Sequence, residues 1–235
     1  MKKTFFWFIA KHFSFLVYVK QFFFAWIESA FPLKNSYSQH KEDVYILNQL
    51  KDINLEKGIY VDVGANQPTR LSNTFLFYKQ KYYGIVIEPN SSIEPLFRIF
   101  RPKDIFLNVG AGAKTSIEVF KKSSTSVLSG FSPEIDSVVS YNYVPVITLD
   151  SLLPIIGNKF IYLLSIDTEG YDIFVLQGAA KILEIALFVI VEINSNSANL
   201  IDTQMKDRGF VKQKIFGCNA IYANTENIDR LTTKL

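Results

Sequence analysis

Cysteine and histidine are scarce in this chain, which limits the chemistry that it can carry. Among 235 residues there is one cysteine, Cys218, and there are two histidines, His12 and His40. A single cysteine cannot form an intrachain disulfide, which fits a reducing compartment such as the cytoplasm. With so few Cys and His ligands, a structural zinc site is not expected.

An excess of charge of one sign is lacking too. Lys and Arg number 25 and Asp and Glu number 22, so the formal net charge is +3. No cluster of basic residues is long enough to form a surface for nucleic acid, so we expect no nucleic-acid partner. The oligomeric state is left open by the sequence.

A long uncharged hydrophobic run is also missing, although residues 1–33 are rich in Phe. Lys11, His12 and Lys20 interrupt the aromatic segment, so no run reaches the roughly 18 uncharged residues of a membrane-spanning helix. On a helical wheel the polar side chains gather in one sector and aromatics cover most of the rest. We predict an interfacial membrane helix anchored by Trp7 and Trp26. A helix packed on the domain or on a partner, a signal peptide and a spanning anchor remain alternatives.

Residues 34–235 read as one α/β domain after a linker that contains Pro32. The apolar fraction of 49% is ample for a sizeable core. Strands alternate with helices, which predicts a Rossmann-like, doubly wound, mostly parallel seven-stranded sheet with an antiparallel C-terminal hairpin. The Ser-rich stretch 121–142 interrupts this alternation and is interpreted as a solvated connection or as a lid over a substrate. The strands are expected over 59–63, 84–88, 104–109, 160–166, 186–193, 210–215 and 219–223, with a further one at 115–120.

Two strand ends carry the main signal for a cofactor. The buried strand 59–63 ends at Gly64, where the absence of a Cβ lets a ligand approach the main chain. The next strand ends at Glu88, and an acid about 20 residues after such a turn suits the two hydroxyls of a ribose. In open α/β sheets, ligands bind outside the carboxyl ends of the strands. A nucleoside-bearing cofactor is therefore expected here.

Missing glycines narrow the choice of cofactor. A dinucleotide site favours Gly-x-Gly-x-x-Gly, whereas residues 64–69 are Gly-Ala-Asn-Gln-Pro-Thr. A phosphate-binding P-loop is excluded as well, because no Gly-Lys-Ser/Thr follows. A cofactor with a ribose but without phosphates fits better, and S-adenosylmethionine is such a cofactor.

Several segments, taken in order, resemble the FkbM-type methyltransferases, which use S-adenosylmethionine and mostly methylate hydroxyl oxygens. The likeness covers roughly residues 37–223 and leaves out the aromatic N-terminus. Thr168 stands where the family more often has Val, and His40 and Lys41 replace a commoner small residue. The matching segments are Ser-Gln-His-Lys-Glu-Asp at 38–43, Asp-Val-Gly-Ala-Asn-Gln-Pro at 62–68, Ser-Asn-Thr at 72–74, Thr-Leu-Asp-Ser-Leu at 148–152 and Ser-Ile-Asp-Thr-Glu-Gly at 165–170.

The resemblance implies five cofactor-binding residues. Asp62 and Gly64 are expected to hold the methionine end, with Asn66 in the same turn. Glu88 is expected to accept both ribose hydroxyls, and Asn108 to lie near the adenine edge. The alternative for Asp62 is a structural acid, hydrogen-bonded within the junction of strand, turn and helix.

Asp167 and Glu169 follow the fourth strand of the parallel sheet and are the first candidates for catalysis. A carboxylate there can take the proton of an acceptor hydroxyl and balance positive charge. The alternative is that they order the loop or hold a divalent ion, which we do not predict. His40 is a further candidate base, because its unperturbed pKa is near neutral. Glu192 is expected to border the same site, and Cys218 to be buried filler.

The leading hypothesis is an O-methyltransferase that acts on a hydroxyl of a sugar, a glycan or a related natural product. We expect it in the cytoplasm, peripheral on the cytoplasmic membrane through residues 1–33. A nucleotide-sugar-modifying oxidoreductase is an alternative, against which the missing glycines speak. A membrane-bound scaffold that kept the fold without activity is another, made less attractive by the intact Asp62, Glu88 and Asp167.

Overall fold

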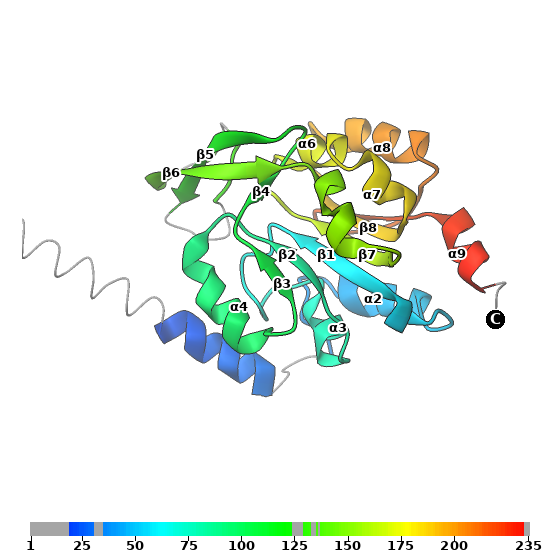
Figure 1. Ribbon diagram of the computed structural model, residues 1–235, viewed down its shortest axis with the longest axis horizontal. Coiled ribbons are helices and arrows are strands. Elements are labelled where there is room, and N and C mark those ends of the chain that lie inside the picture. The colour runs from blue at the N-terminus through cyan, green and yellow to red at the C-terminus, as the bar shows by residue number, and fades with distance from the viewer. Residues whose placement is uncertain (1–18, 31–34, 124–128, 133–134, 136, 233–235) are drawn as a thin grey trace, which may run out of the picture.

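The computed structural model describes residues 19–30, 35–123, 129–132, 135 and 137–232. Its main sheet has seven strands in the order β3-β2-β1-β7-β8-β10-β9 (Figure 1). All pairs are parallel except those of β10, which runs antiparallel to both of its neighbours. This confirms the predicted sheet and its antiparallel C-terminal strands. The strands are β1 (Gly58–Val63), β2 (Gly84–Ile87), β3 (Ile105–Leu107), β7 (Phe160–Ile166), β8 (Ala186–Glu192), β9 (Val211–Phe216) and β10 (Asn219–Ala223).

The central strands are buried on both faces, as their continuous apolar sequences predict. Every residue of β1 is buried, and so are nearly all of β7 and β8. Successive residues of β1 point to opposite faces, so Val61 and Tyr60 belong to two different core clusters. The cluster around Val61 packs under α6 to α8, whereas that around Tyr60 packs under α2 and α3. The sheet is therefore covered on both sides.

Helices cover these two faces (Figure 1). The helix expected around 171–183 is instead two helices, which are separated at Gly178. A Cβ at Gly178 would lie 2.1 Å from the carbonyl oxygen of Gly112, so close backbone approach explains the glycine. The C-terminal helix α9 was not predicted. The helices are α2 (Glu42–Gln49), α3 (Phe75–Lys79), α4 (Glu94–Phe100), α5 (Leu153–Ile156), α6 (Asp172–Gln177), α7 (Ala180–Glu184), α8 (Ala198–Asp207) and α9 (Thr225–Thr232), with 3₁₀ turns η1 (Leu55–Lys57), η2 (Ser91–Ile93) and η4 (Leu149–Leu152).

A second sheet includes both ends of the Ser-rich stretch. It has the order β4-β6-β5, with β4 (Gly110–Ala111), β5 (Ser116–Ser123) and β6 (Val138–Ile147). The interpretation of 121–142 as a connection or lid was therefore wrong at both ends, since β5 runs to Ser123 and β6 begins at Val138. Inward Val144 and Val146 alternate with outward residues, a pattern that the Ser, Asn and Tyr of β6 obscure. Residues 124–128 lie outside the described residues.

Residues 19–30 form a helix that packs against the domain through its polar sector. The Thr69 hydroxyl donates to Glu28 Oε2 at 3.1 Å, and Lys79 Nζ donates to the carbonyl of Ser29 at 2.8 Å. Ala25 on the same side is buried. Figure 1 shows this helix below α4, at the edge of the molecule.

The opposite side of this helix is apolar and exposed. Val19, Phe23 and Trp26, here called the aromatic face, have exposed fractions of 44%, 55% and 49%. Phe23 also stacks on Trp26, with ring centroids 6.4 Å apart. No helix among the described residues is long and apolar enough to cross a bilayer. The predicted anchor Trp7 lies outside the described residues.

Candidate active site

The carboxyl ends of β1, β2 and β7 meet at one cavity of about 300 Å³. In the parallel registers Val63 lies opposite Ile87 on one side and Ile166 on the other, so the residues that follow these strands converge. Gly64, Glu88 and Asp167 all line this cavity. The sequence-based expectation that these three residues share one hollow is therefore confirmed.

Gly64 makes the turn after β1 possible. Its φ is +77°, and a Cβ at this position would lie 1.8 Å from the carbonyl oxygen of Asp167. Its N–H donates to the carbonyl of Ile87 at 2.9 Å, and the N–H of Asp167 donates to the carbonyl of Val63 at 3.0 Å. The glycine thus lets the ends of three strands approach each other, and it keeps the wall of the cavity free of a side chain.

Glu88 is a buried carboxylate at the wall of this cavity. It is only 5% exposed, yet it lines the cavity. Its Oε1 accepts the N–H of Asn90 at 2.7 Å, and its Oε2 accepts the N–H of Asn66 at 2.8 Å. Burial raises the pKa of Glu88 to about 7, against the stabilising effect of the two backbone donors. Each oxygen keeps acceptor capacity for one further donor.

Asp62 is equally buried but does not line the cavity. Its Oδ2 accepts the Thr74 hydroxyl and lies 3.6 Å from Arg101 Nη1. Burial raises the pKa of Asp62, and the guanidinium of Arg101 opposes this. The structure thus places Asp62 in an internal network, as the alternative interpretation described, and not at the cavity wall.

Arg101 organises this network and was missed by the sequence analysis. It follows α4, is 1% exposed, and pairs with Asp104 at 2.6 Å. It also donates to Thr74 Oγ1 at 2.9 Å, and its guanidinium lies 5.3 Å from the centres of the rings of Tyr60 and Phe97. It thereby holds the loop between β1 and α3 against the sheet.

Asn66 and Asn108 support Glu88 from two sides. Asn66 lines the cavity in a left-handed conformation, with φ at +46°, and its N–H binds the carboxylate as described. Asn108 Nδ2 donates to the main-chain carbonyl of Glu88 at 2.8 Å. Asn108 itself does not line the cavity, so the structure places it behind Glu88 and not at the cavity wall.

Three carboxylates gather at the other end of the cavity, from the loop after β7 and the end of β8. Asp167, Glu169 and Glu192 all line it. Burial, together with the charge of neighbouring carboxylates, raises the pKa of Glu169 and of Glu192 to about 7. Burial raises the pKa of Asp167 more strongly, and Glu192 adds to this shift. A pKa of about 7 lets Glu169 and Glu192 exchange a proton near neutral pH.

The loop that carries Asp167 and Glu169 is held in a strained shape by Asp172. Glu169 and Gly170 both adopt left-handed backbone, with φ of +53° and +87°. Asp172 Oδ1 accepts the N–H and the hydroxyl of Thr168, each at 2.9 Å, and its Oδ2 accepts the N–H of Gly170 at 3.2 Å. The unusual Thr168 thus adds a hydrogen bond to the loop. Strained non-glycine backbone of this kind clusters at functional sites.

His40 lies beside the cavity without lining it. Its imidazole packs on Gly217 and lies 3.6 Å from Glu42 Oε1. Glu42 is fully buried and accepts Asn219 Nδ2 at 2.7 Å. Asn219 does line the cavity, and its buried Oδ1 has no hydrogen-bond partner among the described residues. The 38–43 segment therefore fixes Asn219, which sequence analysis did not single out.

The sequence analysis did not name several other lining residues as site candidates, although Gln39 and Asn73 lie in two of the matching segments. These additional residues come from six separate segments, and only the fold brings them together. Cys218, expected to be buried filler, is half-buried and lines the cavity as well. The additional residues are Gln39, Arg70, Leu71, Asn73, Asn90, Phe120, Phe131 and Asn219.

No group of three or more His, Cys, Asp or Glu side chains is arranged to bind a metal ion within the described part of the chain.

The family model for the methyltransferase FkbM domain matches residues 62–212, which is more than half of the chain. The chain belongs to the FkbM methyltransferase family. The matched range begins at Asp62 in β1 and ends in β9, so it contains Gly64, Glu88 and the three clustered carboxylates. The resemblance drawn from the sequence motifs is thereby confirmed.

A comparison with curated proteins gives no match. Among solved structures, methyltransferase FkbM from Methylobacillus flagellatus KT is similar at 14% sequence identity and a TM-score of 0.46. The similarity covers 71% of this chain and 44% of that one, so this chain spans less than half of that protein.

Proposed function

We propose that this chain transfers a methyl group from S-adenosylmethionine to a hydroxyl oxygen of a sugar, a glycan or a related natural product. The observation that carries the cofactor assignment is Glu88. Two backbone donors fix its carboxylate, one at each oxygen, at the wall of a cavity of about 300 Å³. Each oxygen keeps capacity for one hydroxyl donor, which matches a ribose. The cavity is also of the size that small-molecule sites have.

The residues present fit the rest of this cofactor. Gly64 leaves the cavity wall bare, so the cofactor can approach the main chain. The carboxylates of Asp167, Glu169 and Glu192 suit a ligand with an ammonium and a sulfonium group. When bound, S-adenosylmethionine supplies an electrophilic methyl group.

The carboxylate cluster also supplies the base. Burial raises the pKa of Asp167 well above its usual range, and Glu192 adds to this shift. Glu169 and Glu192, with pKa values of about 7, are the members that take the proton of the acceptor hydroxyl. The Oδ1 of Asn219 has unused capacity for a hydroxyl donor at this end. His40 is a weaker candidate, because it does not line the cavity.

Calorimetry with S-adenosylhomocysteine tests the cofactor assignment. We expect one binding site on the full chain. Folded protein that does not bind S-adenosylhomocysteine would falsify the assignment. The acceptor is tested by mass spectrometry of glycans and glycolipids from cells with and without the protein. The expected result is a difference of one methyl group, present as an ether, and an N-linked or S-linked methyl group would contradict the assignment to oxygen.

We further propose that residues 1–33 attach the protein to the surface of the cytoplasmic membrane. A surface helix of a globular protein ordinarily buries its apolar stripe and exposes its polar side. Residues 19–30 do the reverse, because Glu28 and Ser29 face the domain while the aromatic face is exposed. Residues 1–30 also carry four Lys against one Glu, which favours anionic headgroups.

Vesicle flotation tests this attachment. We expect the full chain to float with phosphatidylcholine vesicles that contain phosphatidylglycerol, and less with phosphatidylcholine alone. The Phe23→Ser/Trp26→Ser variant should lose binding by about tenfold or more, because burial of each aromatic side chain is worth about 1.5–3 kcal/mol. Leu200→Ser is the matched control, since Leu200 is 57% exposed on α8. Equal flotation of all three proteins would reject the attachment.

A further inference from the structure

One segment joins the aromatic helix to the cavity. It is the loop between β1 and α3, and it contacts the helix on one side. The Thr69 hydroxyl donates to Glu28, and the guanidinium of Arg70 lies 5.8 Å from the centre of the Phe24 ring. On the other side, Arg70 and Leu71 line the cavity. The helix therefore lies directly beside one rim of the proposed active site.

Leu71, at this rim, combines high exposure with an unfavourable backbone conformation. It is 50% exposed and its φ is +52°, a left-handed conformation that costs a non-glycine residue about 1–2 kcal/mol. An exposed leucine gains nothing from solvent that would offset this strain. Such outliers concentrate at sites where a ligand or a surface is recognised. Together with Phe24, which is 40% exposed, Leu71 extends the apolar surface of the helix to the cavity rim.

We infer that the acceptor is membrane-borne: a hydroxyl on the polar headgroup of a lipid, reached at the surface on which the aromatic face docks. This inference rests on the proposed methyl transfer in this cavity. Interfacial helices sit with their apolar side about 5–10 Å into the boundary between headgroups and acyl chains. The rim beside such a helix lies at headgroup level, where lipid hydroxyls are found. A water-soluble acceptor has no need of an apolar rim.

A bilayer fits the helix better than a protein partner does. Trp and Phe are the side chains that favour the interface between membrane and water. Lys20 lies beside the aromatic face in the helix, and Lys2, Lys3 and Lys11 precede it in the sequence. This combination of aromatic and basic residues matches an anionic lipid surface.

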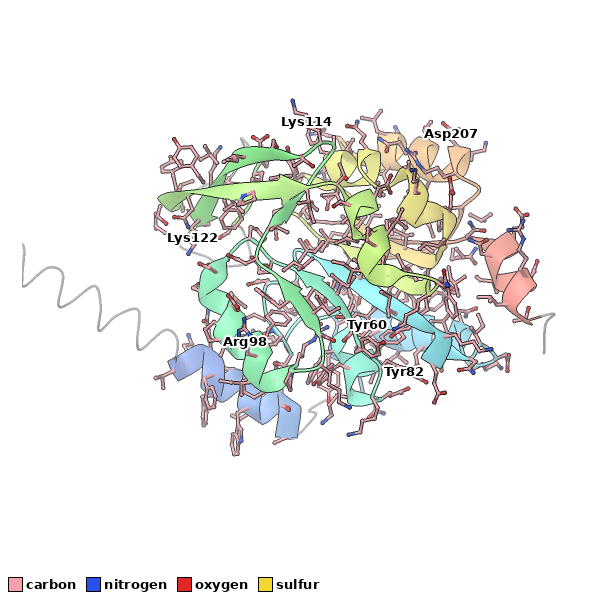
Figure 2. The ribbon with its side chains drawn as sticks, in the orientation of Figure 1. Tyr60, Tyr82, Arg98, Lys114, Lys122 and Asp207 are labelled. Atoms are coloured by element: carbon pink, nitrogen blue, oxygen red, sulfur yellow. The ribbon has the colours of Figure 1, made fainter. Side chains whose placement is uncertain are left out.

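A fluorescent label at the rim tests the geometry. The label is attached to Leu71→Cys in a Cys218→Ser background, after S-adenosylhomocysteine binding has been measured for both. Phosphatidylcholine and phosphatidylglycerol vesicles with brominated acyl chains should quench this label. Labels on Lys114→Cys and Asp207→Cys should not be quenched, because these residues lie at the edge far from the aromatic helix (Figure 2). Quenching at Asp207, or none at Leu71, would overturn the inference. If Leu71→Cys does not fold, slower hydrogen exchange at residues 66–73 of the unaltered chain on vesicle addition decides the matter, and unchanged exchange overturns the inference.

Methyl transfer gives an independent readout. With radiolabelled S-adenosylmethionine and a cell extract, the label should enter the organic-solvent phase with the lipids. Phe23→Ser/Trp26→Ser should reduce this transfer at least tenfold while S-adenosylhomocysteine affinity stays unchanged, and Leu200→Ser should leave it intact. Label in the water-soluble fraction alone would reject a lipid acceptor and leave the methyltransferase assignment standing. Loss of S-adenosylhomocysteine binding in the unaltered protein would instead reject the methyltransferase proposal itself.

Discussion

Asp62 lies in β1, and Glu88 directly follows β2, the parallel neighbour of β1. Each residue is 5% exposed, but the two carboxylates have different partners. Asp62 faces the guanidinium of Arg101 inside the protein. Glu88 lines the cavity, and its carboxylate accepts the backbone N–H groups of Asn66 and Asn90. A buried acid with a cationic partner is part of the scaffold, whereas one with unused acceptor capacity at a cavity is prepared for a ligand.

The largest effect is expected from removing the cation on the scaffold side of this comparison. Arg101→Met should lower the free energy of unfolding by about 3–5 kcal/mol, because it leaves Asp62 and Asp104 buried without their partner. Urea denaturation followed by circular dichroism measures the loss. Arg98→Met is the control: its side chain is exposed and paired only with Glu94, so about 0.5 kcal/mol is expected. A loss below about 1 kcal/mol for Arg101→Met would show that the network is not structural.

Substitution of Glu88 should mainly affect ligand binding, whereas substitution of Asp62 should mainly affect stability. Glu88→Gln should weaken S-adenosylhomocysteine binding by about 10–100-fold, since charge-assisted hydrogen bonds to the ribose are lost. Asp62→Asn should instead cost about 1–3 kcal/mol of stability and leave the affinity nearly unchanged. Calorimetry and urea denaturation on both variants measure the two effects, with exposed Glu56→Gln as the control. If Asp62→Asn weakens binding as much as Glu88→Gln does, the comparison fails.

The strand ends that form the site could be predicted from the sequence, because the strands follow from local patterns. Continuous apolar runs marked β1, β2 and β7, and parallel strands bring their carboxyl ends to one edge. Gly64, Glu88 and Asp167 follow these strands, so their meeting required only the topology. The same reasoning found the polar sector of the aromatic helix, although it did not show that this sector faces the domain.

The rest depends on side-chain directions and distant pairings that no local pattern encodes. Arg101 lies on a different element from Asp62, and nothing in the spacing of the two predicts their contact. Asn108 follows β3 as expected, but its amide turns to the carbonyl of Glu88. Asn219 reaches the site only because β10 inserts between β8 and β9.

The smallest effect is expected from a change of pH. It tests whether Glu88 is partly protonated near neutral pH before a ligand binds. Ribose hydroxyls donate to the carboxylate, so binding favours the ionised form and must expel a proton below the free pKa of about 7. S-adenosylhomocysteine affinity should therefore be highest above pH 7 and fall as the pH is lowered, by at most about tenfold per pH unit. Calorimetry across this range measures it. Since Gln cannot titrate, Glu88→Gln should remove the part of the slope that this residue causes, and an unchanged slope would assign the proton to Glu169 or Glu192 instead.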